Sequence, residues 1–198
     1  MKKSLVMASL IMASTSSMMA MDLQYFLGAG AGASWGKWNE KATVTGPVVN
    51  TTLSESGTDS ATTMILKGGA ILDKTHRLSL SYAPSTNSDA NIHNFFAGYD
   101  YLIPANNESR FYIGTHAGIS SFKGKDDIDE VNMSGFAYGA QVGYIYDITK
   151  NIEFEIGAMY TKMNLEDKGS YVESGHDVSW KFEQESGISS FLGINYKF

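Results

Sequence analysis

Histidine, serine and acidic side chains are the residues of this sequence that could do catalytic chemistry. His93 follows Ser88 and Asp89 closely, and His116 and His176 are the other histidines that could suggest a hydrolase. A Ser–His–Asp triad is defined by its geometry, so nearness in sequence is weak support for a hydrolase. We therefore do not expect an enzyme, and we interpret these histidines as polar loop residues and, at His116, as an interior residue.

A metal or cofactor site is not predicted either. The acidic run Asp126, Asp127, Asp129 and Glu130 does not have the spacing of a calcium-binding EF-hand loop, and runs of like charge are usually solvated. The glycine-rich stretch 28–32 lacks the following helix and the full pattern of a phosphate-binding loop. With no cysteine in the chain, a disulfide framework and a thiolate zinc site are excluded.

The length, the charge and the N-terminal segment restrict the class of protein to which this chain can belong. A chain of 198 residues with a net charge of -6 fits one domain, and its acidity argues against nucleic acid as a partner. Lys2 and Lys3 precede a short apolar run, and small residues follow it up to Ala20. This three-part pattern predicts a secretory signal peptide at residues 1–20 and a mature domain at 21–198.

Apolar residues alternate with small or polar ones along the mature chain. The last segment shows this well, because Leu192, Ile194 and Tyr196 alternate with Gly193 and Asn195. A period of two indicates strands with two different faces. Eight such segments can be distinguished, at residues 23–35, 63–72, 77–82, 94–101, 110–118, 136–146, 153–161 and 187–198.

The connections between these segments alternate in length. Residues 73–75, 104–109 and 149–151 are short turns, and the other connections are mostly longer and polar, at residues 39–61, 84–90, 123–132 and 165–178. An even number of strands with short turns at one end and longer loops at the other predicts an eight-stranded antiparallel up-and-down transmembrane β-barrel. The short turns are then periplasmic and the loops extracellular. Residues 39–61 could extend the barrel as a hairpin above the membrane.

A soluble sandwich or lipocalin also alternates, but its apolar face points inward. Here the polar face is rich in glycine and serine, as in a crowded lumen, and aromatic residues collect near the strand ends. Two aromatic belts are typical of the two membrane interfaces. The predicted girdle consists of Tyr25, Trp35, Tyr82, Tyr99, Tyr101, Tyr144, Tyr146 and Tyr160.

Isolated charges lie on the polar face toward the periplasmic end of the predicted barrel. Their signs mostly alternate between neighbouring strands, so they could pair across the lumen, where charges must be paired or solvated. We predict a salt-bridge network that acts as a structural plug, with a gate as the alternative. Its members are Lys67, Arg77, Asp100, Arg110, Asp147, Glu153, Glu155 and Lys197.

Glycines on the same inward face are compatible with two ways of packing the lumen. Gly143, Gly157 and their counterparts could make room for large inward side chains such as Phe26, Tyr112 and Phe191, or they could leave space for water. The sequence does not separate these two possibilities.

The signal peptide, the eight alternating segments and the ending Ile194-Asn195-Tyr196-Lys197-Phe198 together resemble a known family. The chain is similar to the eight-stranded outer-membrane barrels of the OmpA transmembrane domain, OmpX and opacity-protein type. The resemblance implies that Tyr196 and Phe198 act as the signal read by the barrel-assembly machinery. It also implies a location in the outer membrane of a Gram-negative bacterium.

Members of that family serve envelope integrity, adhesion or small-solute passage. The resemblance therefore implies a structural or surface-interaction role through the extracellular loops, with a small porin-like channel as the alternative and a lipid-modifying enzyme as a third possibility. The expected partners are outer-membrane lipid, lipopolysaccharide, the assembly machinery and host or surface ligands. We expect a monomer without cofactors.

Overall fold

The structure is a computed structural model that describes residues 22–46, 50–125, 131–173 and 176–198. The predicted signal peptide and the acidic run at 126–130 lie outside these described residues. Within the described ranges, no helix is long and apolar enough to cross a membrane. The strands are β1 (Leu23–Thr45), β2 (Asn50–Leu72), β3 (His76–Thr86), β4 (Ala90–Pro104), β5 (Ser109–Gly124), β6 (Asn132–Asp147), β7 (Ile152–Glu173) and β8 (His176–Lys197).

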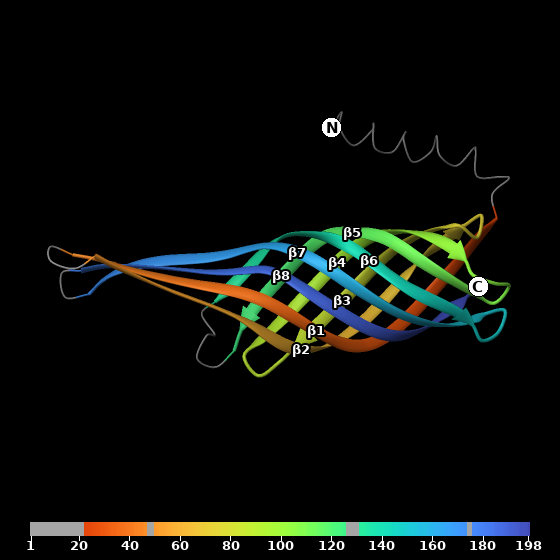
Figure 1. The fold of residues 1–198 in the computed structure, drawn as a ribbon, viewed down its shortest axis with the longest axis horizontal. Coiled ribbons are helices and arrows are strands. Elements are labelled where there is room, and N and C mark those ends of the chain that lie inside the picture. Colours follow the sequence, from red (N-terminus) through yellow and green to blue (C-terminus); the bar gives the residue numbers. More distant parts are fainter. Residues whose placement is uncertain (1–21, 47–49, 126–130, 174–175) are drawn as a thin grey trace, which may run out of the picture.

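These eight strands form one closed antiparallel ring (Figure 1). Each strand pairs with the next in sequence, and β1 pairs with β8 to close the barrel. Closure leaves no unpaired sheet edge within the ring, which is the condition for crossing lipid with strands. The predicted eight-stranded up-and-down barrel is confirmed.

The two faces of the wall differ as the alternation predicted. Leu27, Leu80 and Ile119 point outward and are 61%, 70% and 60% exposed. Phe26 and Phe96 have the opposite parity and are buried inside the barrel. An apolar surface that remains exposed around a closed ring is what a lipid environment stabilises.

The short turns lie at one end of the barrel, together with the start of β1 and the C-terminus (Figure 1). Between β2 and β3, Asp73 and Lys74 have φ angles of 49° and 58°, and the Thr75 amide donates to the Leu72 carbonyl oxygen at 3.1 Å. Two consecutive positive φ angles are those of a type I′ turn, whose twist matches that of the flanking strands. We refer to this end as the periplasmic end.

At the opposite end, four strands continue beyond the barrel. The β2–β3 pairing ends at Thr62 and Thr86, and the β6–β7 pairing ends at Ala137 and Met163. Beyond these points β2, β1, β8 and β7 remain paired and form a four-stranded sheet (Figure 1), called here the extracellular sheet.

The extracellular sheet changes the interpretation of two predicted loops. Residues 39–61 form the expected hairpin, because β1 runs to Thr45 and β2 begins at Asn50. Residues 165–178 were predicted as a polar loop, and that prediction is wrong because β7 runs to Glu173 and β8 begins at His176. Their polar composition hid the strands, which are stabilised by the pairing of β7 with β8 and of β8 with β1.

Ion pairs cover the outward face of this sheet. Lys181 Nζ lies 2.9 Å from Glu166 Oε2 and 2.7 Å from Glu183 Oε1, and Lys168 Nζ lies 3.0 Å from Glu166 Oε1. The Lys181–Glu166 pair joins β8 to β7 and supports the ladder from its exposed side, whereas the other two pairs lie within one strand. The charges that suggested a loop therefore belong to a strand surface in water.

Candidate functional site

The lumen has two regions with different contents. The periplasmic half holds the eight charged side chains that the sequence singled out, together with apolar residues packed among them. The outer half holds a cavity with apolar and polar walls that lies toward the extracellular sheet.

Arg77 on β3 is the centre of the first group of charges. Its Nε donates to Asp100 Oδ2 at 2.8 Å, and its Nη1 and Nη2 donate to the two oxygens of Glu155 at 3.1 and 3.2 Å. Lys67 on β2 also donates to Glu155. Because Glu155 lies on β7, these contacts cross the lumen rather than follow one pair of neighbouring strands.

Arg110 and Lys197 form a second group nearer the periplasmic turns. Arg110 Nη2 lies 3.3 Å from Asp147 Oδ1, and Arg110 also contacts Glu153. Lys197 Nζ lies 2.9 Å from Asp147 Oδ1 and 3.0 Å from Glu153 Oε1. Every cation of the two groups has at least one carboxylate, so the eight charges balance inside the barrel.

Two amides that the sequence analysis did not assign to this network complete it. Asn195 Nδ2 donates to Glu155 Oε2 at 2.8 Å and to Glu153 Oε2 at 3.4 Å, and thereby links the two groups. Gln141 Nε2 donates to Asp100 Oδ1 at 2.6 Å. Both residues have the inward parity of the charged positions, which was the available signal for finding them.

Large side chains fill the space around the charges. The Arg77 guanidinium carbon lies 4.5 Å from the centre of the Tyr112 ring, in cation–π contact. A Cβ atom on Gly157 would lie 2.6 Å from Phe191 Cζ, so only glycine leaves room for this ring. At these positions the inward glycines accommodate aromatic side chains, one of the two possibilities left open by the sequence.

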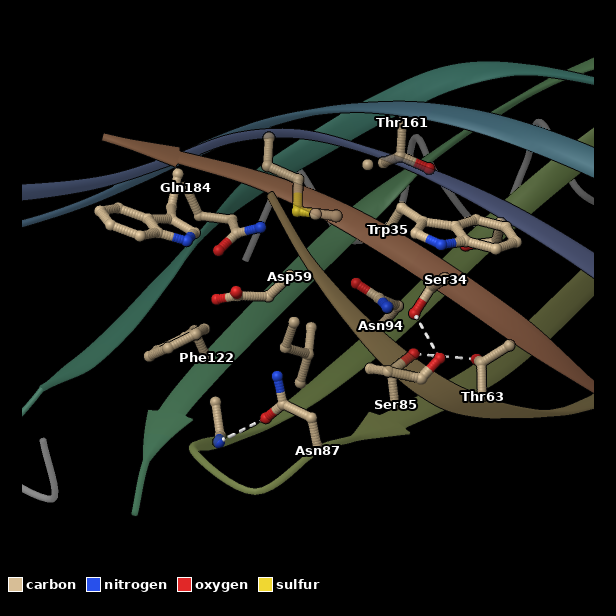
Figure 2. Close-up of a pocket in the computed structure, with 18 of the residues that line it drawn as sticks. Ser34, Trp35, Asp59, Thr63, Ser85, Asn87, Asn94, Phe122, Thr161 and Gln184 are labelled. Carbon is tan, nitrogen blue, oxygen red and sulfur yellow. Dashed lines mark hydrogen bonds between the residues drawn. The ribbon is translucent and has the colours of Figure 1, made fainter. Parts of the chain in front are cut away.

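The outer half of the lumen contains a cavity of about 550 Å³ (Figure 2). Its apolar walls come from β1, β2, β4, β5, β7 and β8, and include Trp38, Ile65, Phe96, Phe122, Met163 and Phe182. The aromatic rings contact one another, with ring centroids 6.0 Å apart for Trp38 and Phe182 and 5.8 Å apart for Phe122 and Phe182.

Most polar side chains of the cavity wall have partners within the wall. Ser85 Oγ donates to Thr63 Oγ1 at 2.9 Å, and Thr63 Oγ1 donates to the Pro84 carbonyl oxygen at 3.2 Å. Asn94 Nδ2 donates to the Ala83 carbonyl oxygen at 3.1 Å. These hydrogen bonds are part of the wall and leave little capacity for a guest molecule.

Gln184 and Trp38 are exceptions in this wall, since within the described residues Trp38 Nε1 is a buried donor without a partner and the Gln184 side chain has no hydrogen bond. Gln184 is 4% exposed, and its amide points into the cavity (Figure 2). A buried amide without a partner costs free energy unless water or a ligand satisfies it. Gln184 is therefore a residue with binding capacity that the fold does not use.

The simple inward–outward alternation along β8 would place the Gln184 side chain on the outer face of the barrel. In β8 the even-numbered residues Ile188 and Leu192 face outward, and Gln184 continues that count. The β1–β8 register shifts, however, because Lys37 pairs with Ser186 and Trp38 with Gln184. The extra residue in β8 is Glu185, which forms a β-bulge. A bulge reverses which residues face the lumen on its far side, so Gln184 points inward.

The predicted girdle residues all lie on the outward face. Six of them are more than 40% exposed, and Tyr82 and Tyr144 are half-buried against neighbouring rings. Phe198 is 70% exposed, and its ring lies edge-on to Tyr196 at 5.1 Å between centroids. Their assignment as membrane anchors and as an assembly signal stays a prediction.

His93 and His116 lie on opposite sides of the barrel wall. His93 Nδ1 bonds the Tyr82 hydroxyl at 2.8 Å on the outward side of the wall. His116 is buried in the lumen, where its Nε2 lies 3.0 Å from Thr161 Oγ1. Within the described ranges, no cluster of three or more His, Cys, Asp or Glu side chains could hold a metal ion.

Comparison with known proteins establishes the architecture. No protein-family model and no curated protein matches the chain. Among solved structures, it is similar to Neisserial surface protein A (NspA), with 13% identity over 88% of this chain and 97% of that one and a TM-score of 0.61. It is also similar to the outer membrane protein OprG from Pseudomonas aeruginosa, with 14% identity over 88% and 95% of the two chains and a TM-score of 0.61. At these identities the likeness concerns the fold alone, and the chain has the eight-stranded β-barrel fold found in outer-membrane proteins.

Proposed function

We propose that this chain is an integral outer-membrane protein of a Gram-negative bacterium that serves as a closed scaffold and presents the extracellular sheet to the surroundings. The charge network across the periplasmic half of the lumen carries the proposal. Arg77 joins β3 to β4 and β7, and its side chain is 3% exposed while those of Asp100 and Glu155 are fully buried. An eight-stranded interior is only just wide enough for its own side chains. A network of this kind supports a structural plug rather than an aqueous pore.

Export and assembly are part of the same proposal. Residues 1–20 would be removed as the signal peptide, and Tyr196 and Phe198 would be read by the barrel-assembly machinery. The outward apolar face would contact lipid and lipopolysaccharide. One chain closes its own ladder through the β1–β8 pairing, which supports a monomer.

A catalytic role is not proposed. His93 lies on the outward side of the wall and His116 in the lumen, so these two residues do not share one site. A surface-interaction role instead rests on the extracellular sheet, whose outward face carries paired Lys and Glu side chains such as Lys181 and Glu166. Host or surface ligands would meet this part of the molecule first.

Single-channel conductance tests the scaffold proposal. Residues 21–198, refolded into a planar bilayer and checked by circular dichroism, should give no reproducible steps. Arg110→Ala weakens the plug, and Lys181→Ala in the extracellular sheet is its control. Stable steps in the unmodified protein that grow in Arg110→Ala but not in Lys181→Ala would contradict closure and make the network a constriction.

A further inference from the structure

The cavity in the outer lumen is large enough for a small organic molecule. Its volume of about 550 Å³ falls within the range of ligand pockets, and rings of Trp38, Phe122 and Phe182 supply an aromatic wall. A site with such a wall favours a ligand that has an apolar body.

The charges of the cavity wall select the sign of that ligand. Glu40, Asp59 and Asp89 line the cavity, and Lys125 is the one cation among its described lining residues. The Lys125 ammonium already donates to Thr86 Oγ1 and to the Asn87 carbonyl oxygen, both at 2.9 Å. The only cationic group among the described lining residues is therefore already hydrogen-bonded, so the wall disfavours an anionic ligand. The three carboxylates favour a cationic ligand instead.

Two of these carboxylates have no internal partner. Glu40 and Asp59 are exposed, and their side chains make no hydrogen bond or ion pair within the part of the chain that the structure describes. Asp59, Gln184 and Phe122 are all directed into the same cavity from three different strands (Figure 2). The unpaired amide of a buried glutamine, an exposed unpaired carboxylate and an aromatic ring thus meet around one space.

We propose that this cavity binds an amphipathic organic cation, with its ammonium group at Asp59 and its apolar body against the aromatic wall. The carboxylate supplies the opposite charge, the rings supply cation–π and apolar contact, and Gln184 supplies a hydrogen bond that the fold leaves unused. A bare metal ion suits the site poorly because most of the wall offers carbon rather than oxygen ligands. The inference goes beyond the scaffold role and does not depend on whether the barrel conducts.

Binding can be measured with three probes of the same shape. Residues 21–198 in phosphatidylcholine nanodiscs, free of detergent, are titrated with 2-phenylethylammonium. The readout is the fluorescence of the three tryptophans, two of which, Trp35 and Trp38, line the cavity. The neutral 2-phenylethanol and the anionic 3-phenylpropionate are the comparison probes. We expect saturable binding of the ammonium compound, weaker binding of the alcohol and the weakest binding of the carboxylate.

Variants locate the interaction. Asp59→Asn should weaken ammonium binding about fivefold or more and leave alcohol binding nearly unchanged, because only the charge is removed. Gln184→Met should weaken both the ammonium compound and the alcohol. Asp177→Asn, at an exposed position of β8 outside the cavity wall, is the matched control and should change neither.

Three results would overturn the proposal. They are the absence of saturable ammonium binding, equal affinity for all three probes, and an Asp59→Asn variant that binds the ammonium compound as tightly as the unmodified protein. Heat-dependent mobility in gels confirms that each variant is folded. Conductance reports on the plug and probe binding on the cavity, so failure of one proposal is distinguishable from failure of the other.

Discussion

The two halves of the lumen use the same barrel wall for opposite purposes. In the periplasmic half, Arg77, Glu155 and their partners fill the interior and satisfy one another. In the outer half, Gln184 and Asp59 face open space without a partner among the described residues. In the periplasmic half the polar groups bond to one another, and in the outer half some polar groups remain available to an external molecule.

This difference follows from side-chain size, charge placement and the local course of the strands. The inner half brings together four cations and four carboxylates with Tyr112 and Phe191 between them, whereas Asp59 and Gln184 of the outer cavity lie on the extracellular sheet. The outer half receives small hydroxyl residues such as Ser85 and Thr63, which bond to the wall itself. One barrel can thus be filled by side chains in its periplasmic half and hollow in its outer half.

Breaking the plug should have the largest effect on stability. Arg77→Met leaves Glu155 and Asp100 buried beside fewer cations, and removing one partner of a buried pair typically costs about 3–5 kcal/mol. We expect the free energy of unfolding to fall by this amount in urea titrations of the protein in liposomes.

The control for this loss is an ion pair of the extracellular sheet. Lys181→Met removes two exposed contacts, and its effect on unfolding should be small because water screens such pairs. If Arg77→Met were as stable as Lys181→Met, the network would not be the element that holds the inner half together.

Adding small side chains sharpens the difference in packing. Gly157→Ala places a Cβ atom 2.6 Å from Phe191 Cζ in the filled half, and overpacking of this kind costs about 1–3 kcal/mol. Ala61→Val adds two methyl groups beside the cavity of the outer half, where space exists, and should be nearly neutral. Urea midpoints of both variants measure this, and equal losses would show that the outer half is packed as tightly as the inner one.

Acid should have the smallest effect, and it should act on the extracellular sheet. Hydrogen bonds from Lys181 and Lys168 lower the pKa of Glu166 below its ordinary value, so the unfolded state binds the proton more readily at mildly acid pH. The stabilisation by Glu166 is complete above its unfolded pKa and is lost as the pH falls through the lowered folded pKa. We expect faster amide hydrogen exchange in β7 beyond Leu165 at low pH, after correction for the intrinsic rate. The change should be reduced in Glu166→Gln, and an unaltered pH response in that variant would assign it to another group.

The sequence predicted the barrel well because its signal is local. Alternation along each strand requires only neighbouring residues, and it correctly placed Leu80 outside and Phe96 inside. The inward position of Arg77 and Glu155 followed from the same count. Their direct contact did not, because alternation says which side chains enter the lumen but not which of them meet across a closed ring.

Two features depended on pairing partners and escaped prediction for that reason. Residues 165–178 have the composition of a loop, and only the β7–β8 and β8–β1 ladders and the ion pairs around Lys181 make them strands. Gln184 enters the cavity because a bulge inverts the facing of β8, and the shift is visible only against the register of β1. The candidate ligand site therefore emerged from the structure, whereas the candidate plug could be anticipated.

Thiol labelling tests the contrast between the two halves most directly. The chain has no cysteine, so Ile65→Cys in the cavity wall and Ile145→Cys in the plugged half each introduce one reactive group. The two isoleucines are 4% and 0% exposed and belong to two separate apolar clusters, which makes them a matched pair. A small cationic methanethiosulfonate added on the extracellular side should modify Ile65→Cys readily and leave Ile145→Cys unmodified until the protein is unfolded. Equal rates of modification at the two positions would contradict a barrel that is open outside and closed within.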